Sequence, residues 1–246
     1  MNKQRKIYHS IIVVVIAMML TMPLQALITL GAHTSGGSAN SDNFTTSAIS
    51  TINATLLVAC VADRDGSTTF SDNQSNTWTA TTNYNTTLSF LRFYYVANPT
   101  TNASHTFTVS CSGCAPTIGG IAAFTGTATT SVSETVTGAT NTATTTLQPG
   151  SITPGANDYL LVSCYGGIDT YSSVSAPFTP AIEEVTVTGN RNASAFAYEI
   201  QTTATARNPT WTWSFATTAT ATMGSFKVAT ATSSAPSTLL LLSPGQ

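Results

Sequence analysis

The chain has 246 residues, of which only 7% are charged, and its formal net charge is −2. An ordinary soluble domain carries about 25% charged residues, so Thr, Ser and Asn must supply most of the polar surface here. Three of the eight basic residues lie within the first six positions, which leaves five against ten acidic residues in the rest. This balance offers no basic patch for phosphates and argues against nucleic-acid binding.

The chain begins with the pattern of a secretory signal peptide. Three basic residues precede an apolar run of twelve residues, 11–22, which Pro23 ends. A run of this length is short for a membrane-spanning helix. We therefore predict that residues 1–26 are a cleaved signal. The alternative is an uncleaved anchor over about residues 7–30, which would be the protein's contact with a membrane. In either case the folded part is expected to be secreted or to lie at the cell surface.

The remainder of the chain contains an internal repeat with an offset of 104 residues. TFTVS at 106–110 returns as TWTWS at 210–214, and LLVAC returns as LLVSC, with Cys60 matching Cys164. At the same offset Tyr94 matches Tyr198. Separate segments that keep one spacing indicate two copies of one unit. The predicted copies span 27–130 and 131–232.

The sequence of each copy predicts seven short β-strands. The apolar runs are short and rich in Thr and Val, turn residues separate them, and none has the period of an amphipathic helix. In chain order the predicted strands are 27–32, 44–50, 55–62, 77–81, 88–97, 105–110 and 118–125 in the first copy, and 131–137, 142–148, 159–165, 178–188, 193–201, 210–215 and 222–228 in the second. The predicted fold class is all-β, a two-layer antiparallel β-sandwich of jelly-roll or immunoglobulin-like character.

The two copies can be assembled in two ways. The short link of residues 126–130 permits one compact sandwich in which the copies share a core, and we take this as the leading architecture. The alternative is two tandem seven-stranded sandwiches. Residues 233–246 follow as a low-complexity tail.

Four cysteines are compatible with disulfides in an exported protein. Cys60 and Cys164 lie on apolar strands, where we expect small buried side chains that can pair if the copies pack symmetrically. Cys111 and Cys114 lie in a turn after a strand and are the candidates for a local disulfide. The sequence places no second close cysteine pair beside them, which argues against a zinc site.

The most acidic loop of the chain contains Asp63, Asp65 and Asp72. Carboxylates around a Gly-containing turn are ligands of the kind that calcium prefers, so these three residues are the candidate metal site. The loop does not complete an EF-hand, because no Glu stands at the closing position. The simpler interpretation is a turn built from Asp and Gly. No other cofactor is predicted.

Trp211, Trp213 and Phe215 alternate along one predicted strand and therefore share a face. Such a row is able to stack on a sugar. The first copy has Phe107 and Val109 at the matching positions, and a face that accepts Trp, Phe or Val is more simply a core face. We therefore interpret this row as part of the core.

Trp78 follows the polar loop that begins at Asp72. Its surroundings are less apolar than those of the other two tryptophans, so Trp78 and its neighbour Asn76 are the candidate ligand-binding residues. The alternative is a half-buried tryptophan with a structural role.

The sequence gives little support to catalysis. Glu183 and Glu184 are the one acidic pair, but consecutive strand residues point to opposite faces and cannot flank one substrate bond. His33 and His105 have no recognisable nucleophile near them in the sequence. We therefore predict that the protein is not an enzyme.

Several of these segments also resemble a known group of proteins. DNQSNTW at 72–78, FYYVA at 93–97, the T-aromatic-T strands and SFK at 225–227 are similar to a broad group of uncharacterised β-sandwich proteins, found among exported bacterial proteins and phage virion proteins. The resemblance covers nearly all of the chain after the leader, although the group usually has Gly where this chain has Ser75. It implies a fold and no particular activity.

The sequence thus predicts a non-enzymatic structural or adhesion module, located outside the cell or on a virion. Its expected partners are glycans or proteins of a cell surface or virion. The alternative is a carbohydrate-binding module, assisted by calcium.

Overall fold

The computed structural model describes residues 27–38, 41–64, 66, 68–112, 117–130, 133–156, 159–168, 171–187 and 192–230. Leu27–Ala229 forms one compact unit. Its described part consists of β-strands and turns, and it holds no α-helix with the length and hydropathy needed to cross a bilayer. The predicted signal and the predicted tail lie outside the described residues. The all-β prediction is confirmed, because antiparallel sheets packed face to face build the unit.

The first copy builds a six-stranded antiparallel sheet around an apolar central strand. In spatial order its strands are β1 (Thr29–Gly37), β9 (Thr117–Thr125), β3 (Leu56–Asp63), β7 (Phe90–Ala97) and β5 (Thr79–Ala80), and β6 (Tyr84–Asn85) also pairs with β7. Every residue of β3 is buried. The unbroken apolar run of β3 suits a strand whose two faces are both covered.

The second copy repeats this spatial order strand for strand. Its sheet runs β10 (Ser133–Leu147), β15 (Trp211–Lys227), β11 (Tyr159–Gly167), β14 (Asn192–Gln201) and β13 (Thr179–Val187), with β12 (Tyr171–Val174) also paired to β15. Thus β10 corresponds to β1, and β11 to β3. The main path of the two sheets thus has the same order, whereas the additional strand differs, because β6 pairs with β7 in the first sheet and β12 pairs with β15 in the second.

The structural offset between the copies is not constant along the chain. Val58 pairs with Tyr95 in the first copy, and its counterpart Val162 pairs with Tyr198 in the second. Tyr198 therefore corresponds to Tyr95 in the structure. The equivalence of Tyr198 with Tyr94, inferred from the constant offset of 104, is wrong by one residue. The error matters because a slip of one residue moves a side chain to the other face of a sheet.

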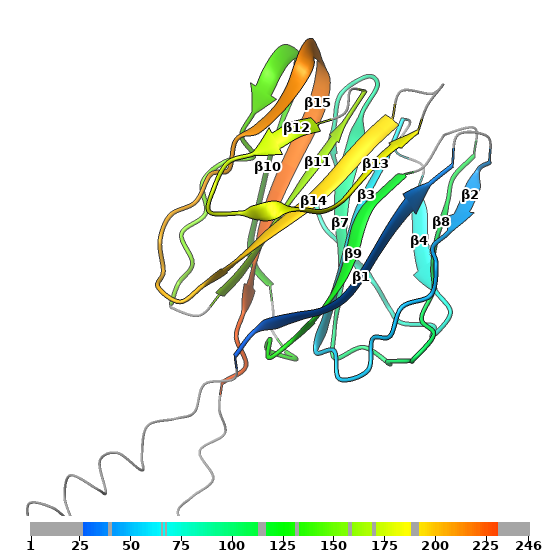
Figure 1. The fold of residues 1–246 in the computed structure, drawn as a ribbon, viewed down its shortest axis with the longest axis vertical. Helices are drawn as coiled ribbons and strands as arrows, with labels where there is room; N and C mark the ends of the chain where they lie inside the picture. The colour runs from blue at the N-terminus through cyan, green and yellow to red at the C-terminus, as the bar shows by residue number, and fades with distance from the viewer. Residues whose placement is uncertain are drawn as a thin grey trace, which may run out of the picture. The chain divides into compact units, whose positions relative to one another are not determined.

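A smaller layer from the same copy covers the outer face of each large sheet (Figure 1). In the first copy this layer is a three-stranded sheet, whose strands are β2 (Asn43–Thr45), β8 (Phe107–Ser110) and β4 (Thr69–Asp72). In the second copy the small layer is formed by the end of β10, by β12 and by the start of β15, where Leu147 and Val174 each pair with Trp211. The long strands β10 and β15 continue from this small layer into the large sheet.

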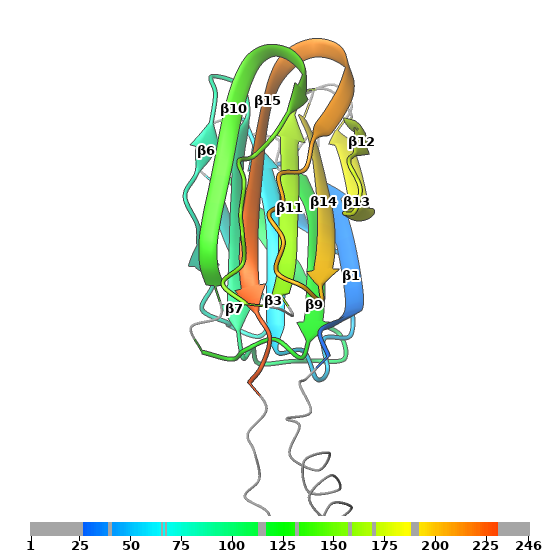
Figure 2. The ribbon, with the colours of Figure 1, turned by 90° about the vertical axis from the view of Figure 1, so that its left-hand side faces the viewer.

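Figure 2 shows β10 and β15 bending together from one layer into the other. The sequence predicts two separate strands in each of these stretches, and the structure joins them. Register shifts on either side of Thr144 allow β10 to turn without ending. Phe215 lies at the bend of β15 and is 72% exposed, so its assignment to the core was wrong.

The two large sheets face each other across a central core to which both copies contribute. Its fully buried members include Leu56, Phe93 and Phe124 from the first copy, and Leu160, Cys164, Phe196 and Phe226 from the second. Cys60 and Cys164 form a disulfide across this core, with 6.0 Å between their Cα atoms, a usual separation for a disulfide. The copies are therefore joined both by packing and covalently.

Each copy also has an outer core between its large sheet and its small layer. In the first copy the outer face of β3 packs against Phe107 and Val109. In the second copy Trp211 and Trp213 pack over Ala and Met side chains of β14 and β15. Both tryptophans are buried, which confirms their interpretation as core residues. Each copy thus has two layers of its own, and the copies share a third core between them.

The chain enters and leaves this unit at the same point. A Cβ atom on Gly126 would lie 2.3 Å from the carbonyl oxygen of Leu27, and the backbone N–H of Ala229 donates to the carbonyl oxygen of Gly126 at 2.8 Å. The start of β1 and the end of β15 accordingly converge in Figure 1. We call this end of the sandwich the proximal end, and the end at which β3 reaches Asp63 the distal end.

Candidate functional site

The carboxylate of Asp72 is the hub of the loop between β4 and β5. One oxygen accepts hydrogen bonds from the backbone N–H groups of Gln74, at 2.8 Å, and Asn76, at 3.1 Å. The other accepts from Asn76 Nδ2 at 2.9 Å and from Trp78 Nε1 at 2.8 Å. Burial alone raises the pKa of Asp72, but these donors together hold it below the usual value of 3.8. Asp72 therefore organises the loop as an anion.

Asn76 connects this loop to the neighbouring loop between β7 and β8. Its side-chain amide donates to the carbonyl oxygen of Thr100 at 3.1 Å and accepts from the N–H of Thr100 at 2.7 Å. All the polar atoms of the Asn76 side chain are thus engaged within the protein. The structure gives Asn76 a positioning role between two loops, and its predicted ligand remains a prediction.

Trp78 is half-buried and packs against the outer core of the first copy. Its ring meets Phe70 edge-on at 4.6 Å and Phe107 at 6.0 Å between centroids. Its indole N–H already donates to Asp72. A platform that stacks on a ligand needs a free ring face, and these contacts favour the alternative of a structural tryptophan.

His105 lies beneath the same loops and is fully buried. Its Nδ1 lies 2.8 Å from Thr51 Oγ1, its Nε2 lies 3.4 Å from Asp72 Oδ2, and its ring stacks on Phe107 at 4.5 Å. Nε2 has no hydrogen-bond partner of good geometry. Burial lowers the pKa of His105 below its usual 6.5, and the neighbouring Asp72 opposes this only in part. The ring is therefore neutral at neutral pH.

The sequence did not reveal this histidine as a site residue. Thr51 and Asp72 are far from His105 along the chain, and only the pairing of β4 with β8 brings the carboxylate to the ring. The available signal was a lone histidine at the first position of the predicted strand 105–110, which does not identify its partners.

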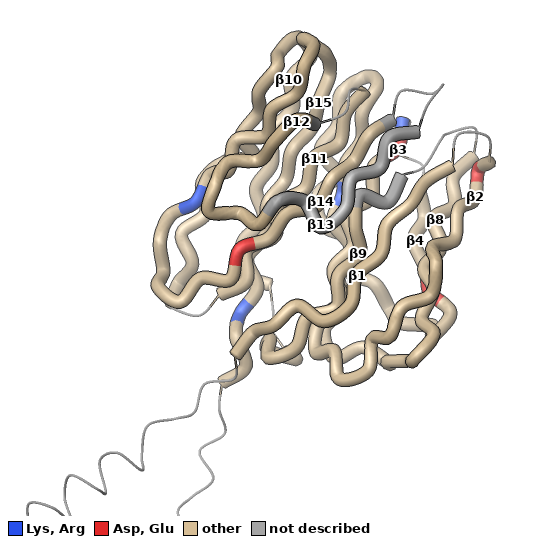
Figure 3. Tube along the Cα trace, in the orientation of Figure 1, with Lys and Arg blue, Asp and Glu red and all other residues tan. Residues whose placement is uncertain are grey.

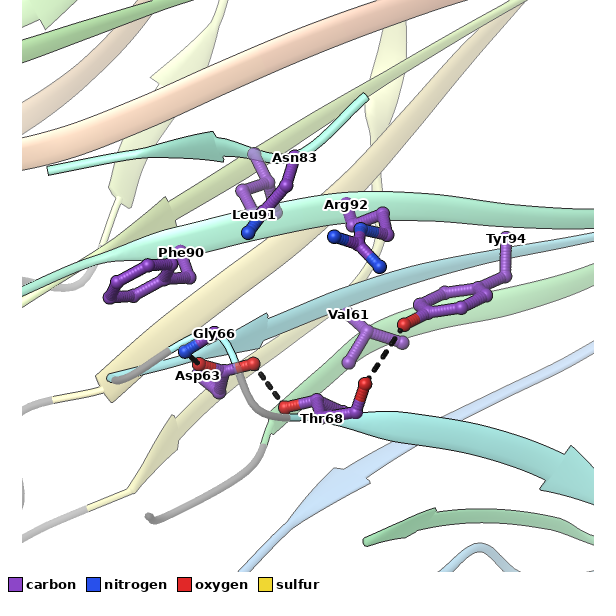
Figure 4. Close-up of a pocket in the computed structure, with 9 residues that line it drawn as sticks. All are labelled: Val61, Asp63, Gly66, Thr68, Asn83, Phe90, Leu91, Arg92 and Tyr94. Atoms are coloured by element: carbon purple, nitrogen blue, oxygen red, sulfur yellow. Dashed lines mark hydrogen bonds between the residues drawn. The ribbon is translucent and has the colours of Figure 1, made fainter. Parts of the chain in front are cut away.

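A second cluster lies at the distal end, around a small pocket between β3 and β7 (Figure 4). The carboxylate of Asp63 accepts hydrogen bonds from the Gly66 N–H and the Thr68 hydroxyl, and Tyr94 OH donates to the carbonyl oxygen of Thr68 at 3.2 Å. The Arg92 guanidinium lies 5.9 Å from the centre of the Tyr94 ring. The pocket volume of about 10 Å³ accommodates roughly one water molecule.

The charges around this pocket act on Tyr94. Burial raises the pKa of its hydroxyl above 10.0, the nearby Arg92 opposes the rise, and Asp63 reinforces it. Tyr94 is thus a neutral hydrogen-bond donor at physiological pH. The cluster fixes the turn that follows β3.

The structure does not bring the three candidate calcium ligands together. Asp63 is bonded to Thr68, just before β4, whereas Asp72 is the last residue of that strand. The intervening backbone spans roughly 13 Å, and one calcium ion needs ligands within about 2.6 Å. The two carboxylate oxygens of Asp72 already accept four N–H hydrogen bonds from neighbouring residues. These bonds occupy the lone pairs with which Asp72 would bind a cation.

Asp65 lies outside the described residues, so calcium at the turn around Asp63 stays a prediction. Across the described ranges of the chain, no three His, Cys, Asp or Glu side chains are gathered as a metal-binding group. Figure 3 shows that the few charged residues are scattered over the unit.

Two further predicted groups are placed only in part. Cys111 is disulfide-bonded, but Cys114 lies outside the described residues, so the local pairing stays a prediction. Glu183 and Glu184 are consecutive residues of β13, paired with Phe196 and Ala195. The directions of their side chains lie outside what the structure describes, so the expectation that they face opposite ways stays a prediction.

The second copy holds a different polar pair at the place that corresponds to His105. In the first copy an isolated bridge joins Ile49 to His105, and in the second it joins Ile152 to Arg207. Arg207 binds the carboxylate of Glu199 through Nε, at 2.8 Å to one oxygen, and through its terminal nitrogen, at 2.8 Å to the other. The sequence analysis did not identify this pair, in which Glu199 lies on β14 and Arg207 lies in the segment between β14 and β15.

No protein-family model, curated protein or solved structure matches this chain. The resemblance to exported and virion β-sandwich proteins therefore stays a prediction.

Proposed function

We propose that the protein is a non-enzymatic structural or adhesion module that is displayed outside the cell or on a virion. The observation that carries the proposal is the shared point of arrival and departure of the chain at Gly126. If the unit is attached through the two ends of its chain, and both ends lie at the proximal end, the distal end points away from the attachment.

Among the described residues, two of the four exposed large apolar side chains lie at the distal end, and the other two, Leu27 and Ile52, lie at the proximal end. At the distal end Leu88 is 41% exposed and Phe215 is 72% exposed. Leu88 lies just before β7, whose first residue pairs with Asp63. Phe215 lies just before the residues of β15 that pair with the last residues of β11. Exposed apolar side chains at loop tips are suited to contacts with another protein. The disulfide in the central core suits a molecule that works in an oxidising environment.

The display role is tested by comparing two epitope insertions in the full-length chain. One short epitope is placed after Thr87, at the distal end, and the other after Asn53, in the exposed turn at the proximal end. We expect antibody to label intact cells or virions strongly through the distal epitope and weakly through the proximal one. Equal labelling, stronger proximal labelling, or absence of the chain from surface and virion fractions would contradict the proposal.

A carbohydrate-binding module is the second candidate, favoured by hydroxyl rows on both outer layers. In the first copy Thr45, Thr108 and Ser71 lie side by side across three strands, and Thr45 and Thr108 are hydrogen-bonded at 2.9 Å. In the second copy Thr212 and Ser173 are hydrogen-bonded at 2.6 Å, beside Thr146. Such rows offer uncharged donors and acceptors to sugar hydroxyls.

A glycan array distinguishes this candidate from the display role. The unit 27–232 is applied with and without calcium, next to a Thr108→Val and Thr212→Val double variant. Binding that the double variant loses would establish the hydroxyl rows as a sugar-binding surface. Binding that requires calcium would favour the turn at Asp63. We expect no binding under either condition, because the tryptophans Trp211 and Trp213 are buried.

A further inference from the structure

The two copies hold equivalent loops with chemically different polar pairs. The segment before β8 is fixed by buried His105 against Asp72, and the segment before β15 by Arg207 against Glu199. Arg207 is a permanent cation with two well-formed hydrogen bonds. His105 changes its charge between about pH 5 and 8 in an unperturbed setting. Only the first copy is therefore built to respond to mild acid at this position.

The surroundings of His105 make protonation costly. The segment from Ile49 to Thr51 and the stacked Phe107 are uncharged, and β4 contributes the one charged neighbour among the described residues packed against the ring, Asp72. The contact with Asp72 is 3.4 Å long, and Nε2 makes no good hydrogen bond. A charged imidazolium at this place would be fully buried with one anionic neighbour, and the Asp72 oxygen that faces it already accepts from Asn76 and Trp78.

We propose that His105 and Asp72 form an acid-sensitive latch, which holds residues 73–78 on the proximal end of the first copy and loosens when His105 takes up a proton. The loop is the natural element to respond, because Asp72 binds the N–H groups of Gln74, Asn76 and Trp78. Any movement of the carboxylate toward a charged ring strains these bonds. The inference does not depend on the display role.

The direction of the effect follows from burial. Burial lowers the pKa of His105 more than Asp72 raises it, so the closed latch prefers the neutral ring. As the pH falls below 6.5, the open loop binds protons more readily than the closed one, and the equilibrium shifts toward the open loop. Above that pH the latch is fully closed.

Hydrogen–deuterium exchange of the full chain tests the latch. Protection of residues 73–78 is compared at pH 7.5 and pH 5.0 after correction for intrinsic exchange, with residues 202–206 beside Arg207 as the internal control. We expect protection to fall several-fold in 73–78 and to stay unchanged in 202–206. Equal loss in both loops, or no loss in either, would overturn the proposal.

Two variants and one direct titration complete the test. His105→Gln should abolish the pH response of residues 73–78, whereas His33→Gln, which changes a histidine of β1, should retain it. Since His105→Gln is at risk of misfolding, the wild-type His105 ring is also titrated by NMR, where a midpoint below 6.5 is expected. A midpoint at or above 6.5, or a persisting response in folded His105→Gln, would refute the latch.

Discussion

Trp211 connects packing and hydrogen bonding within a single side chain. Its indole is fully buried, and its N–H donates to Ser163 Oγ at 2.9 Å, which in turn donates to the carbonyl oxygen of Thr222 at 3.1 Å. The short chain of bonds satisfies every polar atom of the tryptophan and the serine inside the outer core of the second copy. Removing the ring therefore leaves both a cavity and an unmet acceptor.

We expect Trp211→Ala to lower the free energy of unfolding by about 3–5 kcal/mol, and Trp211→Phe by about 1–2 kcal/mol. The difference separates the loss of volume from the loss of the N–H donor. Urea denaturation measures both values, with Ile52→Ala as the control, because Ile52 is 56% exposed and its truncation should change stability by less than about 0.5 kcal/mol. A Trp211→Ala cost close to that of the control would show that the ring is not part of a packed core.

Asp72 is the residue on which the loop after β4 depends. In Asp72→Asn two of the four N–H donors would face an amide N–H₂ group in place of an oxygen. We expect a loss of about 1–3 kcal/mol in unfolding free energy. Intrinsic fluorescence should also change through Trp78, whose N–H loses its acceptor, and a Trp78→Phe background provides the control for the other two tryptophans.

Asp72 and His105 both make the fold less stable in acid, in two separate pH windows. The pKa of His105 is lowered below 6.5, so its contribution is present above 6.5 and is lost as the pH falls through the folded pKa. The pKa of Asp72 is lowered below 3.8, so its contribution is present above 3.8 and is lost below that value. Urea midpoints measured across this range should decline in two steps. His105→Gln should lack the step at the higher pH. A urea midpoint that rises as the pH falls would contradict the expected loss of stability in acid.

At the scale of elements, Gly126 fixes the place where the chain enters and leaves. Its φ is +76°, which favours glycine, and a Cβ atom would lie 2.3 Å from the carbonyl oxygen of Leu27. We expect Gly126→Ala to cost about 1–3 kcal/mol and to loosen the start of β1. Gly224→Ala is the matched control, since its Cβ would meet no atom closer than 3.5 Å. Thermal denaturation of the two variants should rank Gly126→Ala as clearly less stable.

The central strands could be predicted from the sequence because their signal is local. The unbroken apolar runs at β3 and β11 and the repeat between them are visible in the residues themselves, and the structure places both strands in the middle of their sheets. The continuity of β15 was not predicted, because the sequence indicates one strand that ends at 215 and another that begins at 222, whereas β15 bends without ending. The match of Tyr94 with Tyr198 was wrong for a related reason, since a deletion of one residue between the copies leaves no local signal.

The candidate site was predictable only as a list of residues. The sequence marked Asp63, Asp72, Asn76 and Trp78 as polar or aromatic loop residues, and three of these do form one network. It grouped Asp63 with Asp72 because they are close along the chain, whereas β4 runs between them. His105 joins the network through sheet pairing, which composition and spacing do not encode.

At the scale of the whole molecule, the two copies form one unit with three cores. The central core takes side chains from both large sheets and holds the Cys60–Cys164 disulfide, so neither copy can bury its inner face without the other. The link between the copies and both ends of the unit lie at the proximal end, at Gly126. This arrangement leaves the distal end available for contacts, as the proposed display role requires.

The shared core predicts that the two copies unfold as one cooperative unit. The most direct test is pulsed hydrogen exchange with mass spectrometry along a urea titration of the full chain under non-reducing conditions. Peptides from β3 and from β11 should lose protection at the same urea concentration. Two separate midpoints, one for each copy, would contradict a common core and would indicate two tandem sandwiches that unfold independently.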